Sequence, residues 1–356
     1  MHIFKSYFPI TNRCTYLNTA ASGLLPEPVL EFRRTHDQQF FEGGSLFKER
    51  QGSYLETTRE QVGQLFSCAP NRVALVPNFS YGFNTVLEGI SSTKQVLLLE
   101  GDDPSVNWPF EARGFQIRYC PIDAQLEERI DDAFAKAAPA IFAFSVIQYI
   151  SGIKINLDFI ADLKQRYPDT LFLADGTQFF GTTPFDFDSS GIDILGGSCY
   201  KWMNAGYGNG IFLFKPDVAA YVAPKTTGFN ALQGKYKAQE GSFIGHFEPG
   251  HQDTLNYGSL GAAITLINEF GLAQLSNQIN ELGNLAKAAF IERKLLEKAV
   301  VARTEHSSIF NLKGDDALIA KLRDANIICI KRGDGIRVSF HYYNTKEDLE
   351  RLLAFL

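Results

Sequence analysis

Short apolar runs that alternate with helical stretches are the feature that most constrains how this chain folds. Each run has the length and composition of a strand buried on both faces, and helical segments lie between the runs. This alternation predicts an α/β fold in which helices cover a mainly parallel sheet. The predicted strands are Val73–Val76, Gln95–Leu99, Ala140–Phe144 and Leu171–Ala174, and the predicted helices include Ser80–Ile90, Gln125–Ala137 and Leu157–Tyr167.

The pattern changes twice further along the chain. After Asp175 come two short runs with many glycines around them, Ile192–Leu195 and Gly210–Phe214, and then Pro224–Gly250, the segment most typical of a long loop. From about Gly258 an α+β pattern begins. We therefore predict a large domain at 16–250 and a small domain made of 1–15 with 258–356. The small domain's predicted elements are a helix ending at Gly271, a long helix at about Leu272–Lys298, strands near Ile327–Ile330 and Ile336–Phe340, and a helix from Lys346.

Composition excludes several classes of partner. The 356 residues include 34 basic and 40 acidic side chains, with no basic block, so neither nucleic acid nor a membrane surface is an expected partner. The five cysteines are scattered without a CxxC pair or a histidine cluster, so we expect no disulfide frame and no metal site. The N-terminus lacks the apolar stretch of a secretory signal, and no run is long enough to span a bilayer. We expect a soluble cytoplasmic protein.

Asp175 and Lys201 form the pair with the most chemical content. An aspartate directly after the strand Leu171–Ala174 lies at the carboxyl end of a parallel sheet, where such folds bind ligands, and a lysine after the next strand can share that crevice. A buried carboxylate keeps a pyridinium ring protonated, and a lysine can form an imine and carry a proton. Taken singly, a turn-capping aspartate and a surface lysine would be ordinary. Their order and spacing favour a pyridoxal 5′-phosphate (PLP) site, with Lys201 as the Schiff-base lysine.

A turn after the strand Val73–Val76 is suited to a phosphate group. The sequence Asn78-Phe79-Ser80-Tyr81-Gly82 opens a predicted helix, whose free N–H groups and positive dipole end attract a dianion. Ser80 could instead be a simple helix cap. Two residues just before Lys201, namely Ser198 and Tyr200, can add hydroxyl donors, although Tyr200 could also fill the core.

The stretch ADGTQFFG…DFDSSGIDILGGSCYKWMNAGYGNGIFLF resembles the cofactor-lysine region of the class V aminotransferase family, which includes cysteine desulfurases, kynureninases and isopenicillin-N-epimerase-like proteins. YLNTAASG at Tyr16–Gly23 is similar to that family's N-terminal substrate-side segment. IRVSFHYYNTKEDLERL, from Ile336, is similar to its C-terminal arginine strand and the helix that follows. The resemblance spans nearly the whole chain. It implies the PLP-dependent transferase fold of type I, with a large domain and a smaller α+β domain.

The resemblance also implies roles for individual residues. Asp175 would bind the ring nitrogen, Gln178 the ring 3′-oxygen and Lys201 the aldehyde carbon. The turn with Phe79 and Ser80 would hold the phosphate, together with Ser198 and Tyr200. Arg337, on the polar face of an alternating strand, would grip the substrate α-carboxylate with its planar guanidinium. Without the resemblance, Arg337 could be an exposed strand-edge charge. The small side chains of Ala20 and Ala21 would line the substrate pocket.

The turn Glu248–Thr254 falls where relatives reach the phosphate of a neighbouring subunit. The resemblance therefore implies a homodimer with sites at the interface. His251 stands in this turn where desulfurases commonly have threonine, and it could donate a hydrogen bond to phosphate or merely cap the turn.

One position departs from the family pattern. Relatives place an aromatic ring or a histidine against the cofactor just before a Pro-Ser pair, whereas this chain has Asp103 before Pro104-Ser105. Either Trp108 or another ring fills the place, or that face of the cofactor is open. Gln148 and Tyr149 are near-site candidates in the family, and they could equally be loop residues.

Three hypotheses for function follow. The first is an enzyme of this family that acts on an amino acid, with class V transamination favoured over a kynureninase-like or carbon–sulfur lyase or an epimerase. The second is a non-catalytic PLP-binding relative, for which Asp103 is the only support. The third, a nucleotide-binding oxidoreductase, has only the glycines of Gly206–Gly210, which lack the GxGxxG spacing.

Cys329 bears on the type of reaction. Cysteine desulfurases need a nucleophilic cysteine on a mobile loop ahead of the substrate arginine. Here Cys329 lies in the apolar run Asn326–Lys331, which predicts a buried strand, and Arg332–Gly335 leaves room only for a hairpin turn. The sequence therefore predicts that this is not a cysteine-nucleophile desulfurase.

Overall fold

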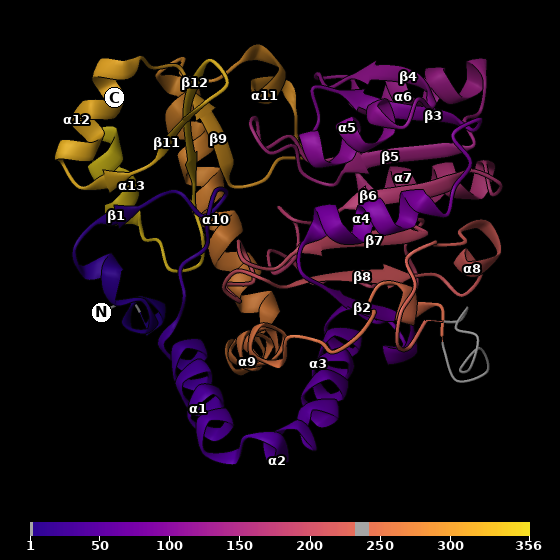
Figure 1. Ribbon diagram of the computed structural model, residues 1–356. Coiled ribbons are helices and arrows are strands. Elements are labelled where there is room, and N and C mark those ends of the chain that lie inside the picture. Colours follow the sequence, from indigo (N-terminus) through magenta and orange to yellow (C-terminus); the bar gives the residue numbers. More distant parts are fainter. Residues whose placement is uncertain (1–2, 232–241) are drawn as a thin grey trace.

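The computed structural model describes residues 3–231 and 242–356, and its centre is a seven-stranded sheet (Figure 1). All neighbouring pairs are parallel except those of β8, which runs antiparallel to both of its neighbours. The predicted α/β fold with a mainly parallel sheet is confirmed. In spatial order the strands are β2 (Val73–Val76), β8 (Gly210–Phe214), β7 (Ile194–Ser198), β6 (Leu171–Asp175), β5 (Ile141–Ser145), β3 (Gln95–Glu100) and β4 (Gln116–Pro121).

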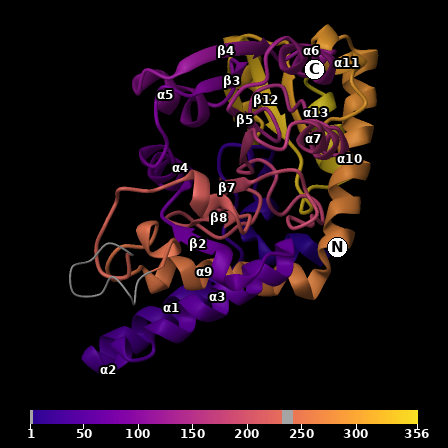
Figure 2. The ribbon, with the colours of Figure 1, turned by 90° about the vertical axis from the view of Figure 1, so that its right-hand side faces the viewer.

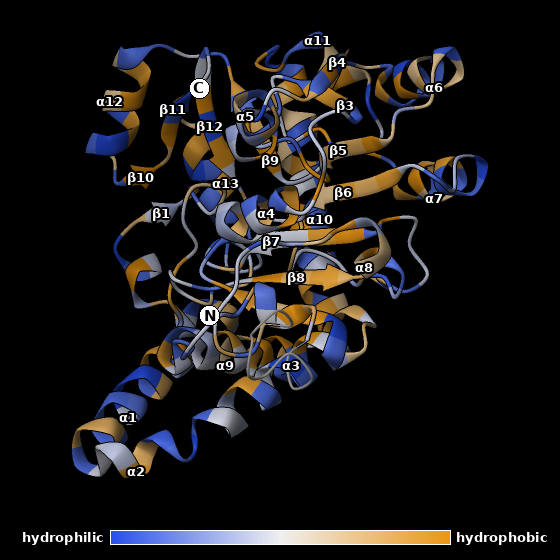
Figure 3. Ribbon diagram, turned by 45° about the vertical axis from the view of Figure 1, so that its right-hand side comes forward, coloured by the Kyte–Doolittle hydropathy of each residue, from blue (hydrophilic) through white to orange (hydrophobic). Residues whose placement is uncertain are grey.

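Helices cover both faces of this sheet because its strands alternate between two apolar cores. In β3, Val96 and Leu98 pack into the core that holds the apolar side chains of α4 (Phe79–Glu88) and α5 (Pro104–Ala112). Leu97 and Leu99 pack into the opposite core, with α6 (Leu126–Lys136) and α7 (Leu157–Arg166). In Figure 3 most of the central strands are coloured as hydrophobic, whereas α6 and α7 also carry hydrophilic turns. A strand buried on both faces has no polar face, which explains its continuous apolar sequence.

Three helices near the N-terminus form an arm. They are α1 (Glu27–Gly43), α2 (Ser45–Lys48) and α3 (Gln51–Phe66), and α1 and α3 pack against α9 (Thr254–Phe270). Figures 1 and 2 show that the α2 end of this arm projects beyond the body of the molecule. This tip exposes large apolar side chains, since Phe41 is 84% exposed and Leu46 is 67% exposed.

The C-terminal third forms an α+β unit beside the central sheet (Figure 1). Its three-stranded antiparallel sheet has the order β11-β12-β9, and β1 (Thr15–Tyr16) pairs with β10, which brings the N-terminal segment alongside. Gly271, at φ 78°, separates α9 from α10 as predicted. The elements are α10 (Leu272–Glu292), α11 (Lys298–Ala302), β9 (Ile309–Leu312), α12 (Asp316–Asp324), β10 (Ile327–Ile328), β11 (Ile330–Arg332), β12 (Gly335–Ser339) and α13 (Lys346–Leu353).

Two of the predicted elements in this region need correction. The long helix ends at Glu292 rather than near Lys298, and the chain turns at Lys294, where φ is 57°. The single strand predicted near Ile327–Ile330 is two short strands, because β10 pairs with β1 whereas β11 pairs with β12.

The remaining elements are short connections. Of the predicted loop Pro224–Gly250, residues 232–241 lie outside the described residues, and the rest contains one 3₁₀ turn. Within the described part of the chain, no helix combines the length and the apolar character that crossing a membrane requires. These connections are η1 (Ile3–Tyr7), η2 (Pro9–Asn12), η3 (Pro70–Arg72), α8 (Val218–Tyr221) and η4 (Ile244–His246).

Gly23 fixes the N-terminal segment against the loop that carries Lys201. Its N–H donates to the Tyr200 carbonyl at 3.1 Å, and a Cβ placed on Gly23 would lie 1.9 Å from the Lys201 carbonyl oxygen. We expect Gly23→Ala to lower the free energy of unfolding by about 1–3 kcal/mol, as overpacking typically does. Chemical denaturation measures this. Gly52→Ala is the control, because no heavy atom lies within 4 Å of its Cβ position in α3, and it should leave stability unchanged or raise it by up to about 1 kcal/mol. Equal stabilities of the Gly23 variant and the parent would contradict this packing.

Candidate active site

A cavity of about 560 Å³ collects most of the residues singled out from the sequence. Its walls come from the N-terminal segment, the start of α4, the ends of β6 and β7 and the hairpin β11–β12. These parts are far apart in the sequence, so the fold itself brings the predicted residues together. The predicted site residues that line the cavity are Ala20, Ala21, Phe79, Ser80, Asp175, Ser198, Tyr200, Lys201 and Arg337.

Asp175 and Lys201 are both buried, at 6% and 9% exposure. Asp175 ends β6 and accepts a hydrogen bond from the Thr177 N–H at 2.8 Å. Burial raises the pKa of Asp175, and the nearby Asp103 carboxylate raises it further. Burial lowers the pKa of the Lys201 ammonium. Within the described residues neither side chain forms an ion pair, so both suit a bound group that carries a charge and a reactive carbonyl.

The start of α4 has the donors that a phosphate requires. The Phe79 N–H donates to the Ser198 hydroxyl oxygen at 2.9 Å, and the Tyr81 N–H donates to the Asn78 side chain at 2.9 Å. The Ser80 N–H has no such partner among the described residues, and Ser80 lines the cavity. A helix of ten residues therefore points its positive end into the cavity.

Arg337 is the most incompletely satisfied side chain in the cavity wall. It is only 2% exposed, and its Nη1 donates to the Tyr149 carbonyl at 2.7 Å. Its Nε and Nη2 atoms are buried with no partner among the described residues. Burial lowers the pKa of Arg337 to about 10. Two adjacent unpaired guanidinium N–H groups match the two oxygens of a carboxylate.

Two predicted residues do not line the cavity. Gln178 is 4% exposed, its Nε2 donates to the Ala20 carbonyl at 2.9 Å, and its Oε1 accepts from Trp202 Nε1 at 2.7 Å. Its amide thus ties the N-terminal segment to the lysine loop. His251 is exposed on its turn, with its ring 6.1 Å from that of Phe229.

The structure also bears on the face where relatives carry a ring. Asp103 itself lines the cavity, and its carboxylate caps α5 by accepting from the Ser105 N–H at 2.9 Å. Trp108 is 65% exposed and lies outside the cavity wall, so it does not fill this place. Of the two near-site candidates, Tyr149 lines the cavity, whereas the Gln148 side chain accepts from the loop N–H groups of Ile150 and Ser151.

Five further lining residues were not identified as site residues from the sequence, namely Asn78, Pro104, Ser105, Thr177 and Arg332. Thr177 accepts from the Ser198 N–H at 3.1 Å, and Asn78 caps α4. Arg332 lines the cavity from the hairpin, where the sequence indicated only a turn. The register of that hairpin is the signal that could have found it, because residues opposite each other in two paired strands share a face.

Cys329 lies outside the cavity wall, in the break between β10 and β11. It is half-buried rather than fully buried, and burial raises the pKa of its thiol to about 11. The predicted hairpin is confirmed, since Arg332 pairs with Gly335 across a tight turn. Cys329 is therefore not carried by a long loop ahead of Arg337.

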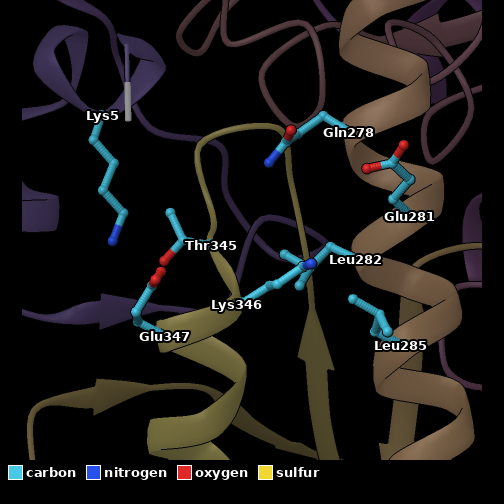
Figure 4. Close-up of a pocket in the computed structure, with 8 residues that line it drawn as sticks. All are labelled: Lys5, Gln278, Glu281, Leu282, Leu285, Thr345, Lys346 and Glu347. Carbon is cyan, nitrogen blue, oxygen red and sulfur yellow. The ribbon is translucent and has the colours of Figure 1, made fainter. Parts of the chain in front are cut away.

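A second cavity of about 690 Å³ lies between α10, the start of α13 and the N-terminal turn (Figure 4). It contains none of the residues expected to carry chemistry. Its wall mixes both charges, and its Lys5 is already paired with Asp348 at 3.0 Å. Within residues 3–231 and 242–356, no group of histidine, cysteine, aspartate and glutamate side chains is placed to hold a metal ion.

Comparison with known proteins places the chain among relatives along its full length. The family profile described as Aminotransferase class-V matches residues 15–352. The chain belongs to the class V aminotransferase family. It is 21% identical to the Bacillus subtilis protein named "Uncharacterized aminotransferase YcbU", over 98% of this chain and 95% of the relative. It is also 24% identical to the isopenicillin N epimerase of Amycolatopsis lactamdurans, with 96% and 94% covered, and 26% identical to a cysteine desulfurase of Yersinia pseudotuberculosis, with 99% and 96% covered.

Solved structures share this fold. A lysine-to-alanine mutant of C-DES, with glycine linked covalently to its PLP cofactor, superposes with a TM-score of 0.88 at 20% identity, covering 98% of each chain. An apo cysteine desulfurase from Thermococcus onnurineus NA1 superposes with a TM-score of 0.85 at 17% identity, covering 98% of this chain and 95% of that one. The expected fold type I of PLP-dependent transferases is confirmed.

Proposed function

We propose that this class V enzyme uses pyridoxal 5′-phosphate, held by Lys201, to act on an amino acid, and that it is an aminotransferase. One observation carries the proposal. A buried lysine, a buried carboxylate and a buried arginine with two unpaired N–H groups face one cavity, and the described residues leave all three without an ion-pair partner. Burying charges without partners costs several kcal/mol each, which a cofactor and a substrate of complementary charge would offset.

Each part of the cavity then has a task. Asp175 would lie at the ring nitrogen of the bound cofactor, where its negative charge would favour the protonated ring. The start of α4, with Ser80 and Ser198, would receive the phosphate. Arg337 binds the substrate α-carboxylate with its free Nε and Nη2 and so orients the amino acid. The bound cofactor supplies an electron sink for the bonds at the substrate Cα.

Lys201 is the group that moves the proton. Its ammonium is buried beside Asp175 and Asp103, and burial lowers its pKa, so the neutral amine is more accessible than on a free lysine. A neutral amine can accept the proton from the substrate Cα and return it elsewhere. Transamination requires only this one proton carrier, as do the related lyase and epimerase reactions that remain as alternatives.

Cys329 argues against the reaction of the desulfurase relatives. A desulfurase nucleophile must be a thiolate that reaches the substrate sulfur, whereas this thiol has a raised pKa and lies outside the cavity. The non-catalytic alternative is disfavoured because Lys201, Asp175 and Arg337 all face the cavity together.

Product analysis tests the type of reaction. The holoenzyme is incubated with amino acids and a 2-oxo acid, and we expect the amino group to appear on the oxo acid. Cys329→Ser should keep this activity within about twofold, while Lys201→Ala should lose about 10²–10⁴-fold because the proton carrier is gone. The same proteins are given cysteine and a reductant. Sulfide release by the parent that disappears in Cys329→Ser would overturn the assignment.

We propose that two copies of the chain pair. The tip of the arm presents Phe40, Phe41 and Leu46 to solvent, at 55%, 84% and 67% exposure, which is unusual for apolar side chains so close together. His251 is exposed on its turn and does not line the cavity of its own subunit. A second copy would cover apolar surface and give this turn a site to complete.

Sedimentation velocity tests the pairing. We expect the parent to sediment as a dimer and Phe41→Glu/Leu46→Glu to dissociate, because each glutamate would have to be buried unpaired. Phe355→Glu is the matched control, since Phe355 is also exposed, at 41%, but lies near the C-terminus. A parent that is monomeric and fully active would contradict the proposal.

A cytoplasmic location is also proposed. All five cysteines are free thiols, four of them buried. Scattered free thiols are typical of a reducing compartment.

A further inference from the structure

Arg332 gives the cavity a second guanidinium group. In the hairpin, Ile330 lies opposite Arg337 and Arg332 lies opposite Gly335. Residues directly opposite each other, and residues two apart on one strand, share a face of the sheet. Arg332 and Arg337 therefore lie diagonally on one face, and both line the cavity.

The guanidinium of Arg332 has no carboxylate partner among the described residues. Its contact is with an aromatic ring, since its Cζ lies 5.8 Å from the ring centroid of Tyr149. The adjacent Lys331, on the opposite face of the hairpin, is by contrast paired with Asp316 at 2.5 Å. Tyr149 also accepts the Arg337 Nη1 hydrogen bond through its carbonyl at 2.7 Å. Both arginines therefore contact Tyr149, one at its backbone carbonyl and one at its ring.

Two acidic residues line the cavity, Asp103 and Asp175, and neither forms an ion pair with Arg332 or Arg337 among the described residues. Asp103 lines the cavity, but its carboxylate caps α5 and forms no ion pair with either arginine within the described residues. Among the neighbouring charges, Asp103 has the largest effect on the pKa of Asp175 and on the pKa of Lys201. Arg332 has the largest such effect on the pKa of Arg337, which it lowers, while Asp103 raises it to a smaller extent. The hairpin side of the cavity therefore carries two like charges, and neither is paired with a carboxylate among the described residues.

We propose that the substrate is an amino acid whose side chain ends in a second carboxylate. Arg337 binds the α-carboxylate, and Arg332, stacked on Tyr149, binds the distal carboxylate. One carboxylate can accept both hydrogen bonds of one guanidinium group. Two guanidinium groups at one end of a cavity therefore suit a substrate with two carboxylates. This inference rests on the proposed function, since it assigns the substrate of that same site.

The test compares glutamate with glutamine and aspartate with asparagine, which differ only in the charge of the distal group. The apparent dissociation constant of each is measured from the change in cofactor absorbance of the holoenzyme. We expect at least one acid to bind at least about tenfold more tightly than its amide, because one charge-assisted contact is gained. Arg332→Gln should abolish this preference and leave the affinity for the amide within about twofold. Lys331→Gln is the matched control, and it should keep the preference.

The outcomes separate this inference from the proposed function. If no amino acid changes the cofactor spectrum, the proposed function fails with it. If the amides and acids bind equally to the parent, only the second carboxylate is excluded. If Arg332→Gln weakens acid and amide by the same factor, Arg332 acts on the α-carboxylate or the cofactor, and the inference is overturned. Calorimetry with glutarate and with pentanoate gives a second readout, in which only glutarate should lose affinity in Arg332→Gln.

Discussion

Two buried charged side chains without ion-pair partners, Asp175 and Lys201, are the constraint on which the rest of this structure depends. Each costs free energy to desolvate, and neither is neutralised by a described residue at close range. Such an arrangement is tolerated where a bound group supplies the charges that complement the two side chains. The parallel sheet makes the arrangement possible, because the ends of β6 and β7 place both residues at one edge.

The N-terminal segment and the C-terminal hairpin close the cavity from the other side, and short polar contacts hold them there. The Ala20 N–H donates to the Ser339 hydroxyl at 3.0 Å, and the Ala20 carbonyl accepts from Gln178. Gly23 then lies directly on the backbone of the lysine loop. The substrate arginine, the small residues of the pocket wall and the lysine are therefore positioned by one connected set of contacts. A change in any of them is expected to alter the geometry at the reacting carbon.

Sequence reasoning was most successful where a pattern is local. The buried strands, the start of α4 and the turn before β12 follow from apolar runs, helix caps and glycine. Most of their bounds agree with the structure to within a residue or two, whereas β7 ends at Ser198, three residues beyond the predicted end at Leu195. β4 was missed because it is an edge strand whose exposed Gln116 and Tyr119 interrupt the apolar pattern. The split between β10 and β11 was missed because it depends on which distant strand each half pairs with.

The candidate site shows the same division. Asp175, Lys201 and Arg337 were identified from their neighbours in the sequence and from family resemblance, and the fold brings them together. The buried amide contacts of Gln178 and the shared face of Arg332 and Arg337 depend on packing and register, which no linear pattern contains. His251 stays a prediction, since its proposed partner belongs to another subunit.

Peptide mapping after borohydride reduction of the PLP-loaded protein tests the central assignment most directly. Reduction fixes the cofactor covalently to the lysine that carries it, and the modified peptide is then identified by mass spectrometry. We predict a single modified site, at Lys201, with no fixed cofactor in Lys201→Ala. A phosphopyridoxyl group on a different lysine of the parent protein, or stoichiometric fixation that survives in Lys201→Ala, would contradict the account.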